Sequence, residues 1–221
     1  SGGEDFIMHV PKDQAEKLQT VPHLQVVSGE TMRIVFMQFN TQDGAPTPAL
    51  KDIRVRQAIA HAINRKGMVD SVLQGHGSLL NGPFLPGGWA ESPEVTAKWE
   101  VDVNKAKQLL AQAGFPNGFE IKLWVPESGS GMQSPKEMAT VIQSDLAKVG
   151  IKTQMTTFEW TTFLSNLNKG TDHAIFVNSW MAGAEDPDMI FSFLYHSRKI
   201  PFPNRAHYRN KEVDALIDKA E

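Results

Sequence analysis

Histidine is the residue type in this chain best suited to binding a metal ion, but the spacing of the histidines argues against a metal site. Seven are present, at positions 9, 23, 61, 76, 173, 196 and 207. None has a second His or a Glu three or four residues away, the spacing that sets two zinc ligands on one face of a helix. The chain has no cysteine, which removes thiolate ligands, disulfides and thiol catalysis together. We therefore expect no metal site and no cofactor, and we keep only His76, between Gly75 and Gly77, as a candidate ligand contact.

A serine-rich segment, Glu127-Ser-Gly-Ser-Gly131, could take part in ligand binding but not in nucleophilic catalysis. It lacks the Gly-x-Ser-x-Gly elbow of serine hydrolases and the Gly-Lys-Ser/Thr ending of a nucleotide-binding loop. It follows an expected strand and leads into an expected helix, where backbone N–H groups can hold an anion. Ser128 is therefore either part of a flexible connection or a polar contact at the rim of a ligand site.

Glu185 and Asp186 are neighbouring carboxylates that could in principle act as a general acid and base. Asp186 directly precedes Pro187, however, and an Asp at that position is typical of a helix N-cap, worth about 1 kcal/mol to its helix. The capping interpretation therefore competes with the catalytic one.

The stretch from Phe176 to Asp188 carries the strongest indication of a binding site. It reads as an apolar strand that runs into a loop bearing Trp180 and Gly183. In an open α/β sheet, ligands are held by loops that leave the carboxyl ends of strands. Trp180 offers a large flat apolar face and one N–H donor, although a Trp packed beneath the loop as core would give the same pattern. The predicted ligand contacts are Asn178, Trp180, Met181, Gly183, Glu185 and Asp186, with His76 and Ser128 as weaker candidates.

The elements that must position these residues alternate between strands and helices. Strands are predicted over 120–125, 151–157 and 173–178, and helices over 102–113, 135–149 and 160–168. Strands separated by helices imply parallel pairing with right-handed crossovers. We therefore predict an α/β fold with a mainly parallel sheet flanked by helices.

Several helix ends are marked by specific residues. Asp52, Asp102 and Ser134 stand where an N-cap is expected. Gly114 and Gly150 stand where a left-handed residue ends a helix. A final helix is predicted after Asn210, with Val213, Leu216, Ile217 and Ala220 on its buried face.

The N-terminal part of the chain is rich in expected strands. Short strands are predicted over 6–10 and 24–27 around a small helix over 13–18, followed by a stronger strand over 33–39. The segment 41–50 contains Gly44, Pro46 and Pro48, so it reads as a loop or a domain linker. The segment 75–99 is a long irregular excursion of the kind that often carries function.

The overall composition excludes several classes of protein. The 221 residues are 41% hydrophobic and 21% charged, as in an ordinary folded protein. The formal net charge is -3 and the 22 Lys and Arg residues are scattered, so we expect no nucleic-acid partner. No apolar run reaches the roughly 18 residues of a membrane helix, so we expect no membrane insertion. The chain begins without Met or a signal-peptide pattern and stops within an amphipathic helical pattern, which indicates a piece of a longer protein.

Four segments together resemble the extracellular solute-binding protein family 5, the substrate-binding subunits of ABC importers for dipeptides, oligopeptides, nickel chelates and related solutes. The matching runs, in order, are Phe36-Met-Gln-Phe-Asn40, Asp52-Ile-Arg-Val-Arg-Gln-Ala-Ile-Ala-His-Ala-Ile-Asn-Arg-Lys66, Asp102 with Lys105-Ala-Lys-Gln-Leu-Leu-Ala-Gln-Ala-Gly-Phe-Pro116, and Tyr208-Arg-Asn-Lys-Glu-Val-Asp214. Their order and spacing fit the family over nearly the whole chain.

The resemblance implies a periplasmic-binding-protein-like (type II) lobe. Members of the family have two lobes, joined by a hinge, that enclose a ligand. By this resemblance, residues 1–40 are a short remnant of the first lobe with the hinge strand. Residues 41–221 are the second, C-terminal ligand-binding lobe, truncated before the chain returns to the first. The protein would be periplasmic, or extracellular and membrane-anchored in a Gram-positive parent.

The function implied by the resemblance is non-covalent capture of a small solute and its delivery to an ABC permease. The solute would be a peptide or peptide-like molecule, a sugar-phosphate-like molecule or a metal chelate. No bond is made or broken, so no catalytic residues are expected.

The chain departs from the peptide-binding members of that family at one position. In those members an acid three residues past the Trp position is expected to hold the amino group of the peptide. Here that position is Gly183, and the nearest acids are Glu185 and Asp186. The departure argues against a ligand with a free amine. The alternative function is that of a small α/β enzyme, a hydrolase or a nucleotide-dependent enzyme, that uses the same sheet edge.

Overall fold

The structure is a computed structural model in which the chain forms two compact units, Ser1–Thr31 and Met32–Glu221. It describes residues 6–8, 10, 12–29, 31–84, 87–92, 94, 99–129, 131–170, 172–181 and 186–220. The candidate site residues all belong to the second unit.

The first unit contains helix α1 (Lys12–Gln19), which confirms the helix predicted over 13–18. The strands predicted on either side of it are wrong, because Phe6 to Met8 and Leu24 to Val27 have no regular structure. Phe6 is 77% exposed and Val27 is 79% exposed. A segment becomes a strand only when a neighbouring strand satisfies its backbone groups, and here the apolar pattern finds no such partner among the described residues.

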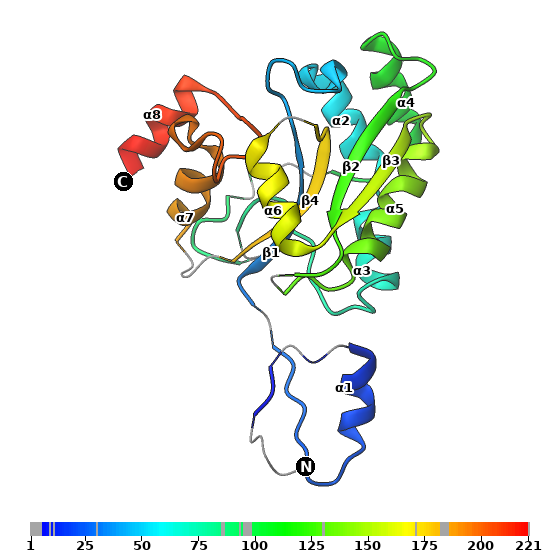
Figure 1. Cartoon of the computed structure of the whole chain (residues 1–221), viewed down its shortest axis with the longest axis vertical. Coiled ribbons are helices and arrows are strands. Elements are labelled where there is room, and N and C mark those ends of the chain that lie inside the picture. Colours follow the sequence, from blue (N-terminus) through cyan, green and yellow to red (C-terminus); the bar gives the residue numbers. More distant parts are fainter. Residues whose placement is uncertain are drawn as a thin grey trace. The chain divides into compact units, whose positions relative to one another are not determined.

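The second unit is built on a four-stranded sheet with the order β1-β4-β2-β3 (Figure 1). The strands are β1 (Arg33–Phe39), β2 (Glu120–Pro126), β3 (Lys152–Phe158) and β4 (Ile175–Met181). Strand β2 pairs in parallel with both β3 and β4, whereas β1 pairs antiparallel with β4. The predicted α/β fold with a mainly parallel sheet is confirmed.

Helices connect and cover these strands. They are α2 (Ile53–Ala62), α3 (Arg65–Ser71), α4 (Val103–Gln112), α5 (Pro135–Ala147), α6 (Trp160–Lys169), α7 (Asp188–Ile190) and α8 (Lys211–Ala220). A π-helical segment, Phe191–Tyr195, continues α7, and short 3-10 turns span Pro48–Lys51 and Ser197–Lys199.

The two faces of the sheet bury different sets of side chains, as the alternation of side chains along a strand requires. On one face, Leu123 and Ile175 belong to the main core, which α2, α4 and α5 cover. On the other face, Trp124 and Phe176 pack against Phe163 of α6. Figure 1 shows α6 lying across this second face, with α2 and α5 on the far side.

Most of the predicted helix ends are confirmed. The Asp52 carboxylate accepts the Arg54 N–H, and the Asp102 carboxylate accepts the Lys105 N–H. Gly114 has φ +89° and Gly150 has φ +87°, the left-handed conformation expected after a helix. The side-chain cap predicted at Ser134 is wrong.

Ser134 precedes α5 with φ 49° and ψ 49°, and its side chain makes no capping hydrogen bond. An N-cap side chain reaches the first helical N–H groups from the extended region, which this residue does not occupy. Pro135 in the first turn and Glu137 near the positive end of the helix dipole remain as features that favour the start of α5.

The last helix forms where it was predicted, but its burial differs. Asn210 accepts the N–H groups of Glu212 and Val213 at the start of α8. Ile217 is 6% exposed, whereas Leu216 is 66% exposed. Of the four apolar residues predicted on the buried face of this helix, only Ile217 is buried in the described part of the chain.

Strand β4 extends beyond the strand predicted over 173–178. Ser179, Trp180 and Met181 pair with β1, where Trp180 lies opposite Ile34 and Met181 opposite Arg33. Trp180 and Met181 thus belong to a strand and not to the loop in which we predicted them. The pairing also places β1, predicted as hinge strand with residues 1–40, in the sheet of the second unit, which begins at Met32.

Candidate functional site

The carboxyl ends of β2, β3 and β4 meet at one edge of the sheet, the lower edge of the sheet in Figure 1. Because β1 runs antiparallel to β4, its first residue, Arg33, lies at the same edge. We call this region the carboxyl edge. It is the part of an open α/β sheet at which ligands are usually bound.

Asn178 and Trp180 lie on the same face of β4 at this edge. Asn178 is 3% exposed, and the Trp180 ring packs in a cluster with Ile34, Ile190 and Leu194. The Oδ1 atom of Asn178 and the Nε1 atom of Trp180 are both buried and have no hydrogen-bond partner in the described part of the chain. Unpaired buried polar atoms are rare and costly, so an acceptor and a donor left two residues apart point to a partner outside the described residues.

The Trp180 ring has the core-packing role, one of the two roles that the sequence left open. Its ring centroid lies 5.9 Å from that of Phe193, so part of the ring serves the core as a packed side chain. Met181, the next residue, is 57% exposed. The last two residues of β4 are therefore apolar, and they pass from a packed position at Trp180 to an exposed one at Met181.

The other three predicted contacts of this stretch are Gly183, Glu185 and Asp186, and the structure describes only the last of them. Gly183 and Glu185 lie outside the described residues. Asp186 is described, and its carboxylate accepts the Asp188 N–H at 2.9 Å. The N-cap residue of α7 is Pro187, however, so the N-cap predicted at Asp186 lies one residue too early.

The segment after β2 is shaped by glycines that approach aromatic and charged side chains. Ser128 is exposed, and the Glu127 N–H donates to Phe158 O at 2.7 Å, which extends the pairing of β2 with β3. A Cβ atom on Gly129 would come within 2.5 Å of the Trp160 ring. The connection is held against the start of α6, and Ser128 lies at the carboxyl edge where it was predicted.

His76 is exposed in the turn after α3, where its N–H donates to Leu73 O at 2.9 Å. The irregular excursion that follows reaches the carboxyl edge through other residues. Leu80 packs against the cluster that contains Trp180, and the Phe84 ring lies 5.6 Å from that of Phe191. The excursion contributes apolar side chains to the edge, which the sequence did not reveal.

Trp89 and Trp99, also in this excursion, have different roles. Trp89 is 72% exposed. The Trp99 ring packs edge-on against His61 at 5.3 Å, and its backbone O accepts a hydrogen bond from Arg65. Trp99 is thus an anchor for the excursion.

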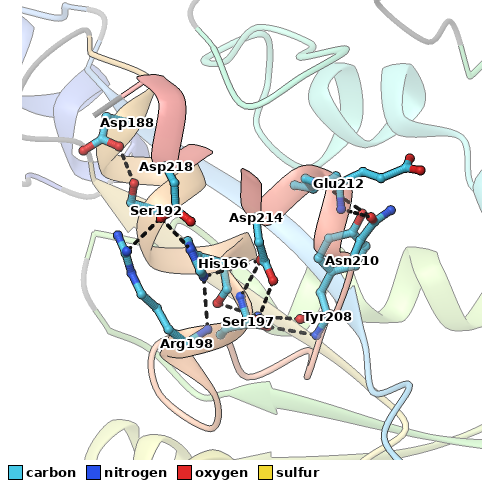
Figure 2. A network of polar contacts seen from close by, with 12 residues as sticks. Asp188, Ser192, His196, Ser197, Arg198, Tyr208, Asn210, Glu212, Asp214 and Asp218 are labelled. Atoms are coloured by element: carbon cyan, nitrogen blue, oxygen red, sulfur yellow. Dashed lines mark hydrogen bonds and ion pairs between the residues drawn. The ribbon is translucent and has the colours of Figure 1, made fainter. Parts of the chain in front are cut away.

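A cluster of histidine, serine and aspartate side chains joins α8 to the preceding turns (Figure 2). The Ser197 hydroxyl donates to Asp214 at 2.5 Å, and His196 Nε2 donates to Asp218 at 3.1 Å. His196 Nδ1 accepts the backbone N–H of Arg198 at 3.1 Å. Both ring nitrogens are engaged and the serine faces a carboxylate, so the cluster attaches a helix and does not form a nucleophile with its base.

An open groove of about 390 Å³ lies between α6 and strands β2 and β3. Its lining is Lys122, Trp124, Gln154, Thr156, Phe158, Asn166, Lys169 and Asp172. None of the predicted ligand contacts lines it, so it does not form part of the predicted site. Among the described residues, no group of three or more His, Asp or Glu side chains could hold a metal ion, and no helix is long and apolar enough to cross a membrane.

Unpaired polar atoms and aromatic rings at the carboxyl ends of the strands are features expected of a site that binds a small ligand in an open α/β sheet. The family described as bacterial extracellular solute-binding proteins, family 5 Middle, matches residues 1–202. The chain belongs to this family. Its members are binding proteins, which excludes the alternative of a small α/β enzyme.

Curated relatives of the chain bind different solutes. Heme-binding protein A of Haemophilus influenzae is 34% identical over the whole of this chain, which covers 39% of that protein. The dipeptide-binding protein of Escherichia coli is 30% identical over 86% of this chain and 33% of its own length. The glutathione-binding protein GsiB of the same species is 29% identical over the whole of this chain and 42% of its own length.

Solved structures show the same fold. The dipeptide-binding protein of a Pseudoalteromonas species in complex with Met-Leu superposes with a TM-score of 0.86 at 29% identity, over 96% of this chain and 41% of that one. HbpA2 from Haemophilus parasuis superposes with a TM-score of 0.83 at 30% identity, over 98% and 41%. The chain therefore spans well under half the length of the proteins it resembles.

Proposed function

We propose that this chain is the second ligand-binding lobe of the substrate-binding component of an ABC-type importer, with residues 1–40 as a remnant of the first lobe and the hinge. In the intact protein the carboxyl edge forms one wall of a cleft that closes over a small solute. Closure is driven only by the difference in the solute's affinity for the closed and open forms. The observation that carries the proposal is the family match, which extends from residue 1 to residue 202.

The location of the site within the lobe is supported by the unpaired atoms of Asn178 and Trp180. A solute that supplies one acceptor and one donor would satisfy Trp180 Nε1 and Asn178 Oδ1 together. Both atoms are buried in the structure, so a ligand reaches them only when neighbouring side chains move. Exposed Met181 and Ser128 form the outer rim.

We assign the solute to the peptide-like class. Dipeptides and glutathione, which two of the relatives are named for, share amide groups that offer a donor and an acceptor close together. That is the complement of the Asn178 and Trp180 pair. The cognate permease is the macromolecular partner, and the intact protein is periplasmic or held outside the cytoplasmic membrane.

The test is a titration of the 15N-labelled 221-residue chain with trialanine, glutathione and hemin, followed by amide chemical shifts. We expect trialanine or glutathione to shift the amides of β4 and of the segment after β2. The affinity will be weaker than micromolar, because a single wall must offset the ordering cost of binding alone. No shift with either peptide at its solubility limit, or shifts with hemin alone, would contradict the proposed solute class.

A matched pair of variants locates the contact. Trp180→Phe keeps an aromatic ring but removes the N–H donor, and we expect several-fold weaker binding of the peptide that binds. Trp99→Phe removes the same atoms at the anchor of the excursion and is expected to leave binding unchanged. Equal affinities for both variants would place the ligand elsewhere.

A further inference from the structure

Arg65, the first residue of α3, joins two distant points of the irregular excursion that follows this helix. Its Nη1 donates to Leu80 O at 2.7 Å, and its Nη2 donates to Trp99 O at 3.0 Å. Nη2 also lies 3.4 Å from Asn81 Oδ1. One guanidinium therefore holds the excursion both near its start and at its end.

The acceptors that Arg65 meets are uncharged. No carboxylate among the described residues forms an ion pair with it, and burial lowers the pKa of the guanidinium from its ordinary value. A partly buried cation is costly unless it is hydrogen-bonded. The two backbone carbonyls are thus the groups that stabilise Arg65 in this position, and the same bonds fix the backbone at Leu80 and Trp99.

The helix end that carries Arg65 is attached to the core of the unit. Asn64 Oδ1 accepts the Gly67 N–H at 2.9 Å at the start of α3. The Asn64 N–H donates to the buried Asp145 carboxylate of α5 at 2.9 Å. Since α5 covers the main core, the excursion is held from a fixed point of the fold.

Leu80 connects this fixed point to Trp180, the predicted ligand contact. The Leu80 side chain packs against the same buried residues as the Trp180 ring, namely Ile34, Ile190 and Leu194. The Leu80 carbonyl is the acceptor nearest to Arg65. Leu80 is therefore held through its backbone by Arg65 and through its side chain by the cluster that supports Trp180.

We propose that Arg65 is a positioning residue for the ligand site, which acts through Leu80 on the Trp180 ring. The proposal rests on the proposed function, because it concerns a contact of the same site. The planar fork of a guanidinium directs N–H groups at two acceptors at once, which a Lys ammonium cannot match in the same geometry. Arg65 thereby keeps Leu80 in the cluster, and the cluster keeps the Trp180 indole N–H in the orientation that the ligand meets.

The test replaces Arg65 with Lys and follows the 15N signals of the 221-residue chain, including the Trp180 indole N–H, which Trp180→Phe identifies. In the ligand-free chain we expect Arg65→Lys to shift this indole signal. We also expect several-fold weaker binding of whichever peptide the unaltered chain binds, trialanine or glutathione.

Arg56→Lys is the matched control. Arg56 donates to Leu50 O and Lys51 O at 2.7 and 2.9 Å, so it holds the backbone of the turn before α2 in the same way. The substitution should leave the Trp180 signal and the affinity unchanged, even where urea unfolding shows a loss of stability.

A double-mutant cycle tests the route through Leu80. Leu80→Ala should weaken binding by itself, whereas Leu79→Ala, at a neighbouring residue that is 40% exposed, should not. Adding Arg65→Lys to Leu80→Ala should then weaken binding little further. If Arg65→Lys does not fold, the leucine pair decides the question, because equal affinities of Leu80→Ala and Leu79→Ala would exclude the route.

The outcomes distinguish the two proposals. An unchanged affinity or an unmoved Trp180 signal in Arg65→Lys overturns the positioning role and leaves the proposed function standing. The same holds for equal weakening by Arg56→Lys, and for an effect of Arg65→Lys that persists in full in Leu80→Ala. If the unaltered chain binds neither trialanine nor glutathione, the proposed function fails and the positioning role fails with it.

Discussion

His173 is a buried ionisable residue that contributes to stability in a pH-dependent way. It is 0% exposed, and its ring lies 5.3 Å from Trp124 and 5.0 Å from Phe176. Neither ring nitrogen has a hydrogen-bond partner in the described part of the chain. Burial, followed by the nearby charge of His207, lowers the pKa of His173 to about 4. The neutral ring is the form that the fold accommodates.

We predict that the chain loses stability as the pH falls from 6.5 to 4. In this window the unfolded chain protonates His173 near its ordinary pKa of 6.5 while the folded chain does not, so protons favour unfolding. The full loss is about 3 kcal/mol and is present below pH 4. Urea unfolding at a series of pH values measures it. The pKa of Asp214 is lowered mainly by hydrogen bonds from Ser197, so its contribution is lost only at lower pH.

A variant isolates this contribution. His173→Gln lowers stability at neutral pH because the ring contacts are lost, but we expect its stability to change much less between pH 6.5 and 4. His76→Gln, which alters an exposed histidine, should keep the pH dependence of the original chain. An unchanged pH dependence in His173→Gln would show that another group is responsible.

At the scale of elements, two turns that precede parallel strands meet through their backbones. Gly118 lies before β2 and Gly150 before β3, with φ +72° and +87°. A Cβ atom on Gly118 would come within 2.0 Å of the Gly150 carbonyl oxygen. The Lys152 N–H donates to Phe119 O at 2.8 Å directly after this contact. The close approach of the two turns thus sets the register in which β2 and β3 begin to pair.

We predict that Gly118→Ala destabilises the fold by about 3 to 4 kcal/mol, because it adds a backbone clash to the cost of a left-handed alanine. Gly114→Ala is the matched control. Gly114 also has a positive φ, +89°, but a Cβ atom there meets no atom within 4 Å, so the expected loss is about 1 to 2 kcal/mol. Urea unfolding of both variants measures the difference. Equal losses would mean that the turns separate at little cost.

At the scale of the whole second unit, the C-terminal helix is attached largely by polar groups. Ser197 and Asp214, and His196 and Asp218, join α8 to the turns that follow β4 (Figure 2). Within the described residues only Ile217 of this helix is buried. An element held by few apolar contacts opens more readily than the sheet does.

We predict that Asp214→Asn increases the rate of amide hydrogen exchange in α8 several-fold and leaves the exchange of β2 and β4 unchanged. The Asp214 carboxylate accepts hydrogen bonds from both the hydroxyl and the backbone N–H of Ser197. The substitution removes its negative charge and so weakens both bonds. Asp70→Asn, at an exposed ion pair with Lys66, is the control and should not affect α8. Equal acceleration throughout the unit would show that α8 opens only with global unfolding.

Much of the architecture follows from local patterns in the sequence. The alternation of apolar segments predicted β2, β3 and β4, the helices between them and their parallel pairing. Capping residues such as Asp52, Asp102 and Asn210 marked helix starts, because a side-chain oxygen one residue ahead of a helix satisfies free N–H groups whatever surrounds it. Trp180 and Asn178 were predicted as ligand contacts from a local feature too, the carboxyl end of an apolar strand.

The tertiary structure alone decided the pairing of β1 with β4, which joins residues about 140 positions apart in the chain. That pairing extends β4 through Met181 and carries Arg33 to the carboxyl edge, where it meets Ser179 and Gly131. No local pattern encodes which strand an edge strand chooses, because the choice depends on the summed burial of both faces of the finished sheet. The sequence by itself determined most elements of the second unit, most of their caps and the resemblance to the family, whereas the tertiary structure decided which side chains meet at the carboxyl edge.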